Sequence, residues 1–361
     1  MTDEDYMKRA LSLARRGMGK TSPNPMVGAL IVKDDRVLGE GYYRYFGGRH
    51  AEVNALEKSG KNVNRATLYV TLEPCCHYGQ TPPCTEAIIA SGIGNVVIGM
   101  LDPDKRVSGR SVEILREQGI ECTVGILEEE CRALNEAYIK HRSTGLPFVT
   151  VKFAQTLDGR IASSTGHSRW ISSPSSRKLG HKLRTRHDAV LVGIGTVAKD
   201  NPQLTVRLVA DRSPLRIILD SSLRIAPDAL VLTEQEKAKT LIAATPDAPR
   251  DRSATLEKMG IEVLMVPQDA RGDVDLRQLL KLLGERNVSS ILVEGGAETI
   301  TSFLRLGLVD RLVVFTAPRI MGRGLEAVGE LDIKEVTGAL KLTFEKVYRC
   351  AEDVVIEARI G

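Results

Sequence analysis

The side chains best suited to chemistry lie in the first quarter of the chain. His50 and Glu52 form a His-Ala-Glu triplet, Cys75 belongs to a Pro-Cys pair, and Cys84 follows a loop rich in glycine and proline. One imidazole and two thiolates make a three-ligand set that suits zinc, and a catalytic zinc keeps its fourth position open for water. We therefore predict that His50, Cys75 and Cys84 bind Zn²⁺ at a hydrolytic site.

Glu52 lies close to the predicted metal without being one of its ligands. That is where a general acid/base must stand if it is to carry a proton from a zinc-bound water. His50 and Cys84 each open a predicted helix, and a helix N-terminus stabilises the anionic form of a thiol. A structural zinc needs four protein ligands, so the three-ligand set favours hydrolysis over a structural site or an inert thiol cluster.

Two neighbouring residues compete for a place at the metal. Cys76 directly follows a ligand and should face away, which favours a small buried residue. His77 is a possible fourth ligand, although a role in the loop or at the substrate is favoured. Cys122, Cys131 and Cys350 have no metal-like spacing, and we interpret them as core or surface thiols.

The His-x-Glu and Pro-Cys motifs resemble the zinc centre of the cytidine/deoxycytidylate deaminase superfamily. The loop from Cys75 to Cys84 is longer than the usual spacing, and it is similar to the deaminase half of the bifunctional riboflavin-biosynthesis deaminase/reductase family. Pro23–Gly28 and the Asp102-Pro103 pair also match that family. The resemblance covers essentially all 361 residues.

This resemblance implies two α/β domains: a cytidine-deaminase-like α/β/α sandwich in residues 1–145 and a dihydrofolate-reductase-like domain in residues 146–361. It implies zinc-hydroxide deamination of 2,5-diamino-6-ribosylamino-4(3H)-pyrimidinone 5′-phosphate, followed by reduction of the ribosyl side chain by NADPH. The product would be 5-amino-6-ribitylamino-uracil 5′-phosphate. Asn24 would hold the base or the ribose, and Asp102 would contact the ribosyl phosphate end or order the loop that does.

Three positions depart from the family pattern. Tyr43 stands where the family usually has histidine, Gln80 where it has lysine or arginine, and Asp104 where it has asparagine. Asp104 places a negative charge where phosphate binding is expected, although Lys105 and Arg106 follow at once. These departures concern substrate contacts and leave the metal ligands unchanged.

A glycine pair marks a possible phosphate site in the second half. Gly295 and Gly296 follow a predicted buried strand and precede a helix. Glycines at such a junction let the backbone approach a phosphate, which the helix N-terminus attracts. An ordinary tight turn is the alternative, and the G-x-G-x-x-G fingerprint of a Rossmann fold is absent.

The family resemblance identifies this half as an NADPH-dependent reductase, through Lys152–Ala162, Ser168–Ser173, Gly195–Val197 and Asp200–Arg207. The cofactor contacts that it implies are Ala154, Trp170, Thr196, Asp200, Ser222, Gly295, Gly296, Ala297, Glu298, Thr299, Ile300, Thr301 and Ser302. The substrate contacts that it implies are Ser168, Arg184, Leu204, Arg207 and Glu294.

Charged side chains of this half suit the implied reaction. Arg184 and Arg207 can form charge-assisted bidentate bonds to the substrate phosphate. Lys152 and Asp158 are the titratable groups expected near the carbonyl of the opened ribose. For each of them, a purely structural role is the alternative. NADPH supplies the hydride, while the protein supplies position and electrostatics.

The distinction between NADPH and NADH requires a contact to the 2′-phosphate. Ser222 and Arg224 follow a predicted strand and are our candidates for that contact. Trp170 is the only tryptophan of the chain, and its residue type alone indicates a core position more readily than a nicotinamide contact.

The elements that must position these residues alternate between strand and helix periodicity, which predicts largely parallel sheets covered by helices on both faces. In the first half we expect helices at 4–17, 51–59, 85–91, 110–118 and 128–142, and strands at 27–33, 37–42, 67–72, 96–100 and 120–124. After a linker at 143–147 we expect strands at 148–154, 189–192, 215–219, 240–243, 290–293 and 310–316, and a hairpin within 342–360.

Composition sets the outer limits. Hydrophobic residues make up 42% and the net charge is only +4, which excludes a disordered chain and a nucleic-acid-binding surface. No apolar run approaches the roughly 18 residues of a membrane span, and the N-terminus lacks a signal peptide, so we expect a cytoplasmic enzyme of a small phosphorylated pyrimidine. The resemblance also implies a homo-oligomer. The alternatives are a nucleobase or tRNA deaminase with an accessory domain, and a reductase with an inactive zinc domain.

Overall fold

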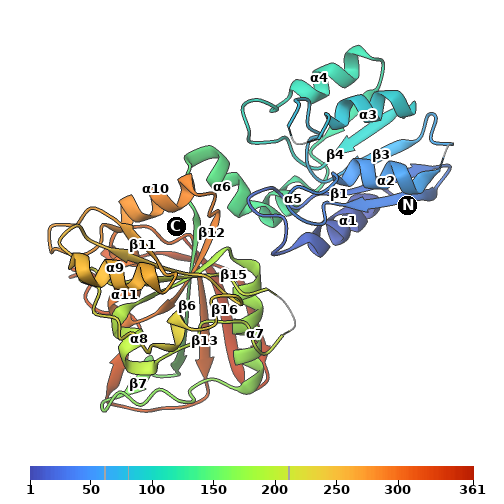
Figure 1. Ribbon diagram of the computed structural model, residues 1–361. Coiled ribbons are helices and arrows are strands. Elements are labelled where there is room, and N and C mark those ends of the chain that lie inside the picture. Colours follow the sequence, from blue (N-terminus) through green and yellow to red (C-terminus); the bar gives the residue numbers. More distant parts are fainter. Residues whose placement is uncertain (61, 80, 210–211) are drawn as a thin grey trace. The chain divides into compact units, whose positions relative to one another are not determined.

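The computed structural model describes residues 1–60, 62–79, 81–209 and 212–361, so Gln80 lies outside the described residues. The chain forms two compact units, Met1–Gly145 and Leu146–Gly361, each built around its own sheet (Figure 1). Within the described residues, no helix is both long enough and apolar enough to cross a bilayer.

The first unit contains a five-stranded sheet in the order β2-β1-β3-β4-β5. The pairs β1–β2 and β1–β3 are antiparallel, whereas β3, β4 and β5 run parallel. The strand bounds are β1 Gly28–Lys33, β2 Arg36–Tyr42, β3 Thr67–Val70, β4 Asn95–Ile98 and β5 Glu121–Val124.

Helices cover both faces of this sheet, because alternate residues of its strands point to two separate apolar cores. Ala29 and Ile31 pack with α2, α3 and α4, whereas Leu30 and Val32 pack with α1, α5 and α6. The predicted α/β/α sandwich is confirmed. The helix bounds are α1 Asp3–Ala14, α2 Ala51–Ser59, α3 Cys84–Ser91, α4 Arg110–Glu117, α5 Glu128–Leu134 and α6 Glu136–Thr144.

The single helix expected at 128–142 is wrong, because the chain forms α5 and α6 with a break at Asn135. This residue has φ −111° and ψ 20°, outside the helical region. Its side chain accepts a hydrogen bond from the Met26 amide at 2.8 Å and donates one to the Met26 carbonyl at 3.0 Å. This tertiary contact competes with the helix, and it redirects α6.

The second unit contains a nine-stranded sheet in the order β11-β10-β9-β8-β12-β6-β13-β16-β15. The strands from β11 to β13 in this order are parallel, and the C-terminal hairpin joins β13 antiparallel. The strand bounds are β6 Phe148–Thr156, β8 Ala189–Gly193, β9 Leu215–Leu219, β10 Thr240–Ala244, β11 Glu262–Met265, β12 Ser290–Gly295, β13 Arg311–Ala317, β15 Leu342–Cys350 and β16 Asp353–Ile360. A separate ribbon pairs β7, Arg160–Ser163, with β14, Gly324–Glu326.

Helices again cover both faces of the sheet. Leu279 and Leu283 of α10 and Phe303 of α11 pack on one face, whereas Val197 of α8 and Leu256 of α9 pack on the other. The expected α/β architecture of this half is therefore confirmed. The helix bounds are α7 Pro174–Arg186, α8 Ile194–Asp200, α9 Arg250–Lys258, α10 Leu276–Glu285 and α11 Ala297–Arg305.

Candidate metal centre and cofactor cavity

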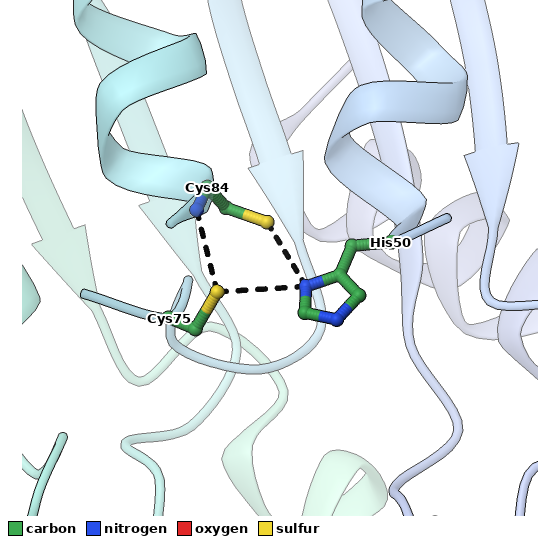
Figure 2. A group of neighbouring side chains, drawn as sticks. All are labelled: His50, Cys75 and Cys84. Atoms are coloured by element: carbon green, nitrogen blue, oxygen red, sulfur yellow. Dashed lines mark hydrogen bonds between the residues drawn. The ribbon is translucent and has the colours of Figure 1, made fainter. Parts of the chain in front are cut away.

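The structure brings together the three residues that the sequence predicts as zinc ligands. The ligand atoms of His50, Cys75 and Cys84 all lie within 4.8 Å of one another. Nδ1 of His50 lies 3.1 Å from Sγ of Cys84 and 3.5 Å from Sγ of Cys75 (Figure 2). One imidazole and two thiols at these separations fit a single zinc ion, which leaves one tetrahedral position for water.

Close packing of helix α2 on the sheet fixes the position of His50. His50 is the N-cap of α2, and Cys84 is the first residue of α3. Gly41 of β2 faces the start of α2, where a Cβ atom would lie 2.0 Å from the carbonyl oxygen of Ala51. Only glycine permits this approach of helix to strand. Backbone packing thus fixes the start of the helix that carries this metal ligand.

The two neighbouring thiols shift each other's pKa in opposite directions. A hydrogen bond from Cys84 is the main cause that lowers the pKa of Cys75 to about 4. The Cys84 amide also donates to Sγ of Cys75 at 3.3 Å. The same contact and burial raise the pKa of Cys84. The lowered pKa favours the thiolate form of Cys75, and metal binding would also remove the proton of Cys84.

Glu52 lies in the same cavity as the three ligands but is not one of them. Its side chain lies in the first turn of α2 and is only 4% exposed. Burial raises the pKa of Glu52 because the charged carboxylate loses its hydration. A carboxylate with a raised pKa accepts a proton more readily than an exposed one does, which suits a proton carrier.

The cavity that contains this centre has a volume of about 330 Å³. Asn24 lines it and donates through Nδ2 to the Tyr43 hydroxyl at 2.9 Å, and that hydroxyl also accepts the Gly47 amide at 2.9 Å. Asp102 lines it as well, and its carboxylate accepts a hydrogen bond from the Tyr138 hydroxyl at 2.9 Å. Asn24 and Asp102, both expected at the substrate, thus lie in the cavity of the metal ligands.

Cys76 and His77, which follow the ligand Cys75 in the sequence, differ in their surroundings. Cys76 is half-buried rather than buried, and its Sγ makes a long contact to the carbonyl oxygen of Arg106, at 3.9 Å. Among the described residues it is not part of the ligand cluster. His77 lines the cavity, and within the described part of the chain its buried Nδ1 has no hydrogen-bond partner. All six cysteines are free thiols.

Tyr138 and Arg142 are among the cavity residues that sequence reasoning missed. Both come from α6, and Arg142 pairs with the cavity residue Asp104. They lie far along the chain from the zinc motifs and carry no motif of their own. The break at Asn135, whose side chain binds Met26, precedes α6, and no local motif marks either residue.

A second, larger cavity of about 1010 Å³ lies within the other unit. It is lined by residues at the carboxyl ends of β8, β9 and β12 and by part of β6, which is the usual ligand edge of a parallel sheet. The expected contacts that line it are Ala154, Ser168, Thr196, Asp200, Glu294, Gly296, Ala297, Glu298, Thr299, Ile300 and Ser302.

The glycine turn at the start of α11 fits a close backbone approach. Gly296 has φ +66°, and a Cβ atom there would lie 3.0 Å from Oγ1 of Thr196. Gly193, at the end of β8, is similarly close to Oγ1 of Thr299, at 2.6 Å from its missing Cβ. The glycines therefore let this turn pack closely against Thr196 and Thr299. The helix N-terminus that follows the turn suits a dinucleotide phosphate.

Several expected contacts lie outside the lining of this cavity. Trp170 is 61% exposed, and the guanidinium of Arg177 stacks over its ring at 4.4 Å. Leu204 is buried in the apolar core with φ +55°. Ser222 and Arg207 are exposed, Gly295 is buried at the end of β12, and Thr301 donates to the Ala297 carbonyl at 2.6 Å.

Arg184 points at Glu294 rather than into the cavity. Its Nε and Nη2 atoms donate to the two Glu294 oxygens at 2.7 Å each, and Nη1 donates to the Thr205 carbonyl at 3.0 Å. Burial alone would raise the pKa of Glu294, but Arg184 lowers it to about 2. Lys152 is half-buried beside this pair, and its loss of hydration lowers its pKa.

The two titratable groups expected near the carbonyl have different surroundings. Lys152 lines the cavity. Asp158 does not, because its carboxylate accepts the Thr156 hydroxyl and the Met321 and Gly322 amides, which anchor a turn. Ser221, Arg224 and Arg271 line the cavity near the end of β9, and Ser221 and Arg271 were missed because nothing in the local sequence distinguishes them.

Family models cover both units. The model described as "Cytidine and deoxycytidylate deaminase zinc-binding region" matches residues 1–100, and the model described as "RibD C-terminal domain" matches residues 147–356. The second match alone covers more than half of the chain. The similarity thus follows the division of the fold into a metal-centre unit and a unit with the large cavity.

Known proteins match along nearly the full length. The riboflavin biosynthesis protein RibD of Aquifex aeolicus is 47% identical, with 98% of this chain and 97% of that protein covered, and that of Escherichia coli K12 is 38% identical, with 99% of each covered. A solved Thermotoga maritima deaminase/reductase is 40% identical with a TM-score of 0.89 and 99% of each chain covered. Solved Acinetobacter baumannii RibD is 34% identical, with the same TM-score and coverage. The chain therefore belongs to the RibD family, the bifunctional zinc-dependent deaminases and NADPH-dependent reductases of riboflavin biosynthesis.

Proposed function

We propose that residues 1–145 hydrolyse the amine of 2,5-diamino-6-ribosylamino-4(3H)-pyrimidinone 5′-phosphate, and that residues 146–361 reduce the ribosyl chain of the product. The observation that most directly supports this proposal is that Glu52 shares one cavity with the three metal-ligand candidates His50, Cys75 and Cys84. The similar Thermotoga maritima protein is a diaminohydroxyphosphoribosylaminopyrimidine deaminase and 5-amino-6-(5-phosphoribosylamino)uracil reductase, which supports this substrate.

In the deaminase unit, His50, Cys75 and Cys84 would hold zinc, which when bound lowers the pKa of water toward neutrality. Glu52 takes a proton from the attacking water and delivers it to the ring nitrogen. The second water proton then passes through Glu52 to the amine as the carbon–nitrogen bond breaks, so that ammonia leaves and a carbonyl forms. Asn24, held by the Tyr43 hydroxyl, orients the substrate.

In the reductase unit, the Gly296 turn and the first residues of α11 would hold the NADPH phosphates, and NADPH supplies the hydride. Glu294 holds the opened sugar chain, and Arg184 positions Glu294 through two hydrogen bonds. Lys152 lies beside this pair with its pKa lowered by burial. It donates the proton that accompanies the hydride, since an ammonium with a lowered pKa gives up its proton more easily.

Ammonia release without NADPH tests the deaminase assignment. The purified full chain should release ammonia from the phosphorylated pyrimidine in a zinc-dependent manner, and should consume NADPH only when the deaminated product is present. A chain that reduces supplied product but never releases ammonia would leave only the reductase, with the zinc domain inactive. Activity on RNA in place of the pyrimidine would favour the tRNA deaminase alternative.

We further propose a cytoplasmic enzyme that assembles as a homo-oligomer through its second unit. Six free thiols suit a reducing compartment. The hairpin strand β15 lies at an edge of the nine-stranded sheet, and its Phe344 and Val347 are 62% and 58% exposed. An exposed apolar edge strand is a common site of association. Light scattering of the full chain and of a Phe344→Lys variant checks the assembly.

A further inference from the structure

The deaminase cavity contains a pair of arginines that the mechanism above does not use. Arg106 lies in the loop between β4 and α4, and Arg142 lies near the end of α6. Both line the cavity that also contains His50 and Glu52. Their side chains are 60% and 38% exposed, so both guanidinium groups remain accessible at the cavity wall.

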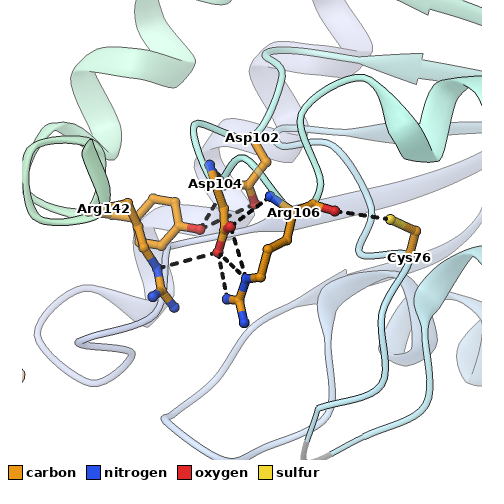
Figure 3. A network of polar contacts seen from close by, with 6 residues as sticks. Cys76, Asp102, Asp104, Arg106 and Arg142 are labelled. Atoms are coloured by element: carbon orange, nitrogen blue, oxygen red, sulfur yellow. Dashed lines mark hydrogen bonds and ion pairs between the residues drawn. The ribbon is translucent and has the colours of Figure 1, made fainter.

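Asp104 holds the two arginines together. Its carboxylate accepts Nη2 of Arg106 at 2.6 Å and Nε of the same residue at 3.0 Å. Nε of Arg142 lies 3.9 Å from Oδ2 of Asp104, and Figure 3 shows the carboxylate between the two arginine side chains. Nη1 of Arg106 and the two Nη atoms of Arg142 take no part in these ion pairs.

The cluster of Arg106, Arg142 and Asp104 carries a net positive charge. Asp104 is 11% exposed and fully ionised at neutral pH, because Arg106 lowers its pKa to about 2. Two guanidinium groups against one carboxylate leave a charge of +1. The adjacent Asp102 has a raised pKa, caused mainly by burial, and receives the Tyr138 hydroxyl. Guanidinium groups that lie close together bind the oxygens of a phosphate monoester better than single cations do.

We propose that Arg106 and Arg142 form the anion subsite that receives the 5′-phosphate of the deaminase substrate. The inference rests on the proposed deamination, since the phosphate is then at the far end of a molecule whose amine faces the metal centre. It also explains how Asp104 can lie in a phosphate-binding cavity: its charge is already paired with the two arginines.

Deamination kinetics on paired substrates test the subsite. Ammonia release by the full chain is measured with the pyrimidine 5′-phosphate and with its dephosphorylated counterpart. We expect Arg106→Met and Arg142→Met each to raise KM for the phosphorylated substrate about tenfold or more, the usual effect of losing one charge-assisted hydrogen bond. The kcat for that substrate and the kcat/KM for the dephosphorylated one should change less than about twofold, since neither arginine touches the reacting amine.

Matched variants separate the subsite from a folding defect. Arg132→Met removes another arginine that is ion-paired, with Glu128 on α5, and does not line the cavity, so it should leave both KM values unchanged. Arg142→Lys keeps the positive charge but loses the paired N–H donors of the guanidinium group, so it should give an intermediate KM for the phosphorylated substrate. Inorganic phosphate should compete with the phosphorylated substrate in the wild type and compete more weakly in both Met variants.

The outcomes distinguish the inference from the function on which it rests. An equal loss on both substrates, or an unchanged KM for the phosphorylated one, overturns the subsite while the deamination stands. A wild-type chain that releases no ammonia from the phosphorylated pyrimidine overturns the proposed deamination, and the subsite with it. Zinc content and NADPH-dependent reduction of supplied product should match the wild type in every variant, which excludes a general loss of structure.

Discussion

Replacement of Arg184 by methionine should destabilise the second unit strongly, because it leaves the carboxylate of Glu294 buried without its main partner. The two side chains are 13% and 10% exposed and joined by two hydrogen bonds of 2.7 Å. Removal of one partner from a buried pair costs about 3–5 kcal/mol. For a unit of this size that corresponds to a fall in Tm of about 6–20 °C.

Differential scanning calorimetry of the full chain measures this change, with NADPH binding as a separate readout. Arg286→Met serves as the control, because Arg286 pairs with Glu262 in the same unit but the two side chains are 42% and 56% exposed. An exposed pair contributes at most about 1 kcal/mol. The double variant Arg184→Met with Glu294→Gln should recover much of the loss, since no buried charge of the pair remains. Strictly additive costs, or a fall in Tm no larger than the control's, would refute the reasoning.

The same pair predicts a pH dependence with a definite sign. Glu294 has its folded pKa lowered from 4.5 to about 2, so it stabilises the fold above its unfolded pKa. That contribution, on the order of 3 kcal/mol, is lost as the pH falls from about 4.5 toward about 2. The Glu294→Gln variant should lack this segment of the stability curve, whereas Arg286→Met should retain it.

Three further predictions concern the metal centre. Glu52→Gln should retain zinc and lose deamination by about 10²–10⁴-fold while reduction of supplied product continues; equal loss of both activities would indicate misfolding instead. Gly41→Ala should lower the zinc content measured by atomic absorption, because its Cβ would lie 2.0 Å from the Ala51 carbonyl and displace α2; full zinc occupancy would contradict this packing argument. Cys76→Ser should keep the metal and Cys84→Ser should lose it, and the reverse order would show that the ligand set is wrong.

The metal centre could be predicted from the sequence because its residues belong to short local motifs. His50 and Glu52 share the first turn of one helix region, and Cys84 opens another, so their spacing places them before any tertiary contact is known. Most strands were also predictable, because their apolar runs follow strand periodicity and are bounded by turns, whereas β7, β11 and β14 were not expected. The α/β/α sandwich and the parallel sheet of the second half follow from that alternation.

Contacts between distant segments explain what the sequence could not reveal. The end of α5 depends on Asn135 binding Met26, a contact across more than a hundred positions of the chain. Arg142 consequently reaches the cavity of Asp104, although Arg142 belongs to no motif. In the second unit, the resemblance suggested that Arg184 of α7 contacts the substrate, whereas its geometry is set by Glu294 of β12. Its predicted contact with the substrate phosphate stays a prediction.

A metal ion bound by His50, Cys75 and Cys84 would also close a loop of the chain in the first unit. His50 and Cys84 stand 34 positions apart, and Cys75 lies between them. Ions that bridge such positions act as reversible staples, and in a chain-entropy treatment closing a loop of this length restricts the unfolded ensemble by on the order of 4 kcal/mol. Cellular zinc supply would then govern how long this half of the enzyme persists, as well as how fast it turns over.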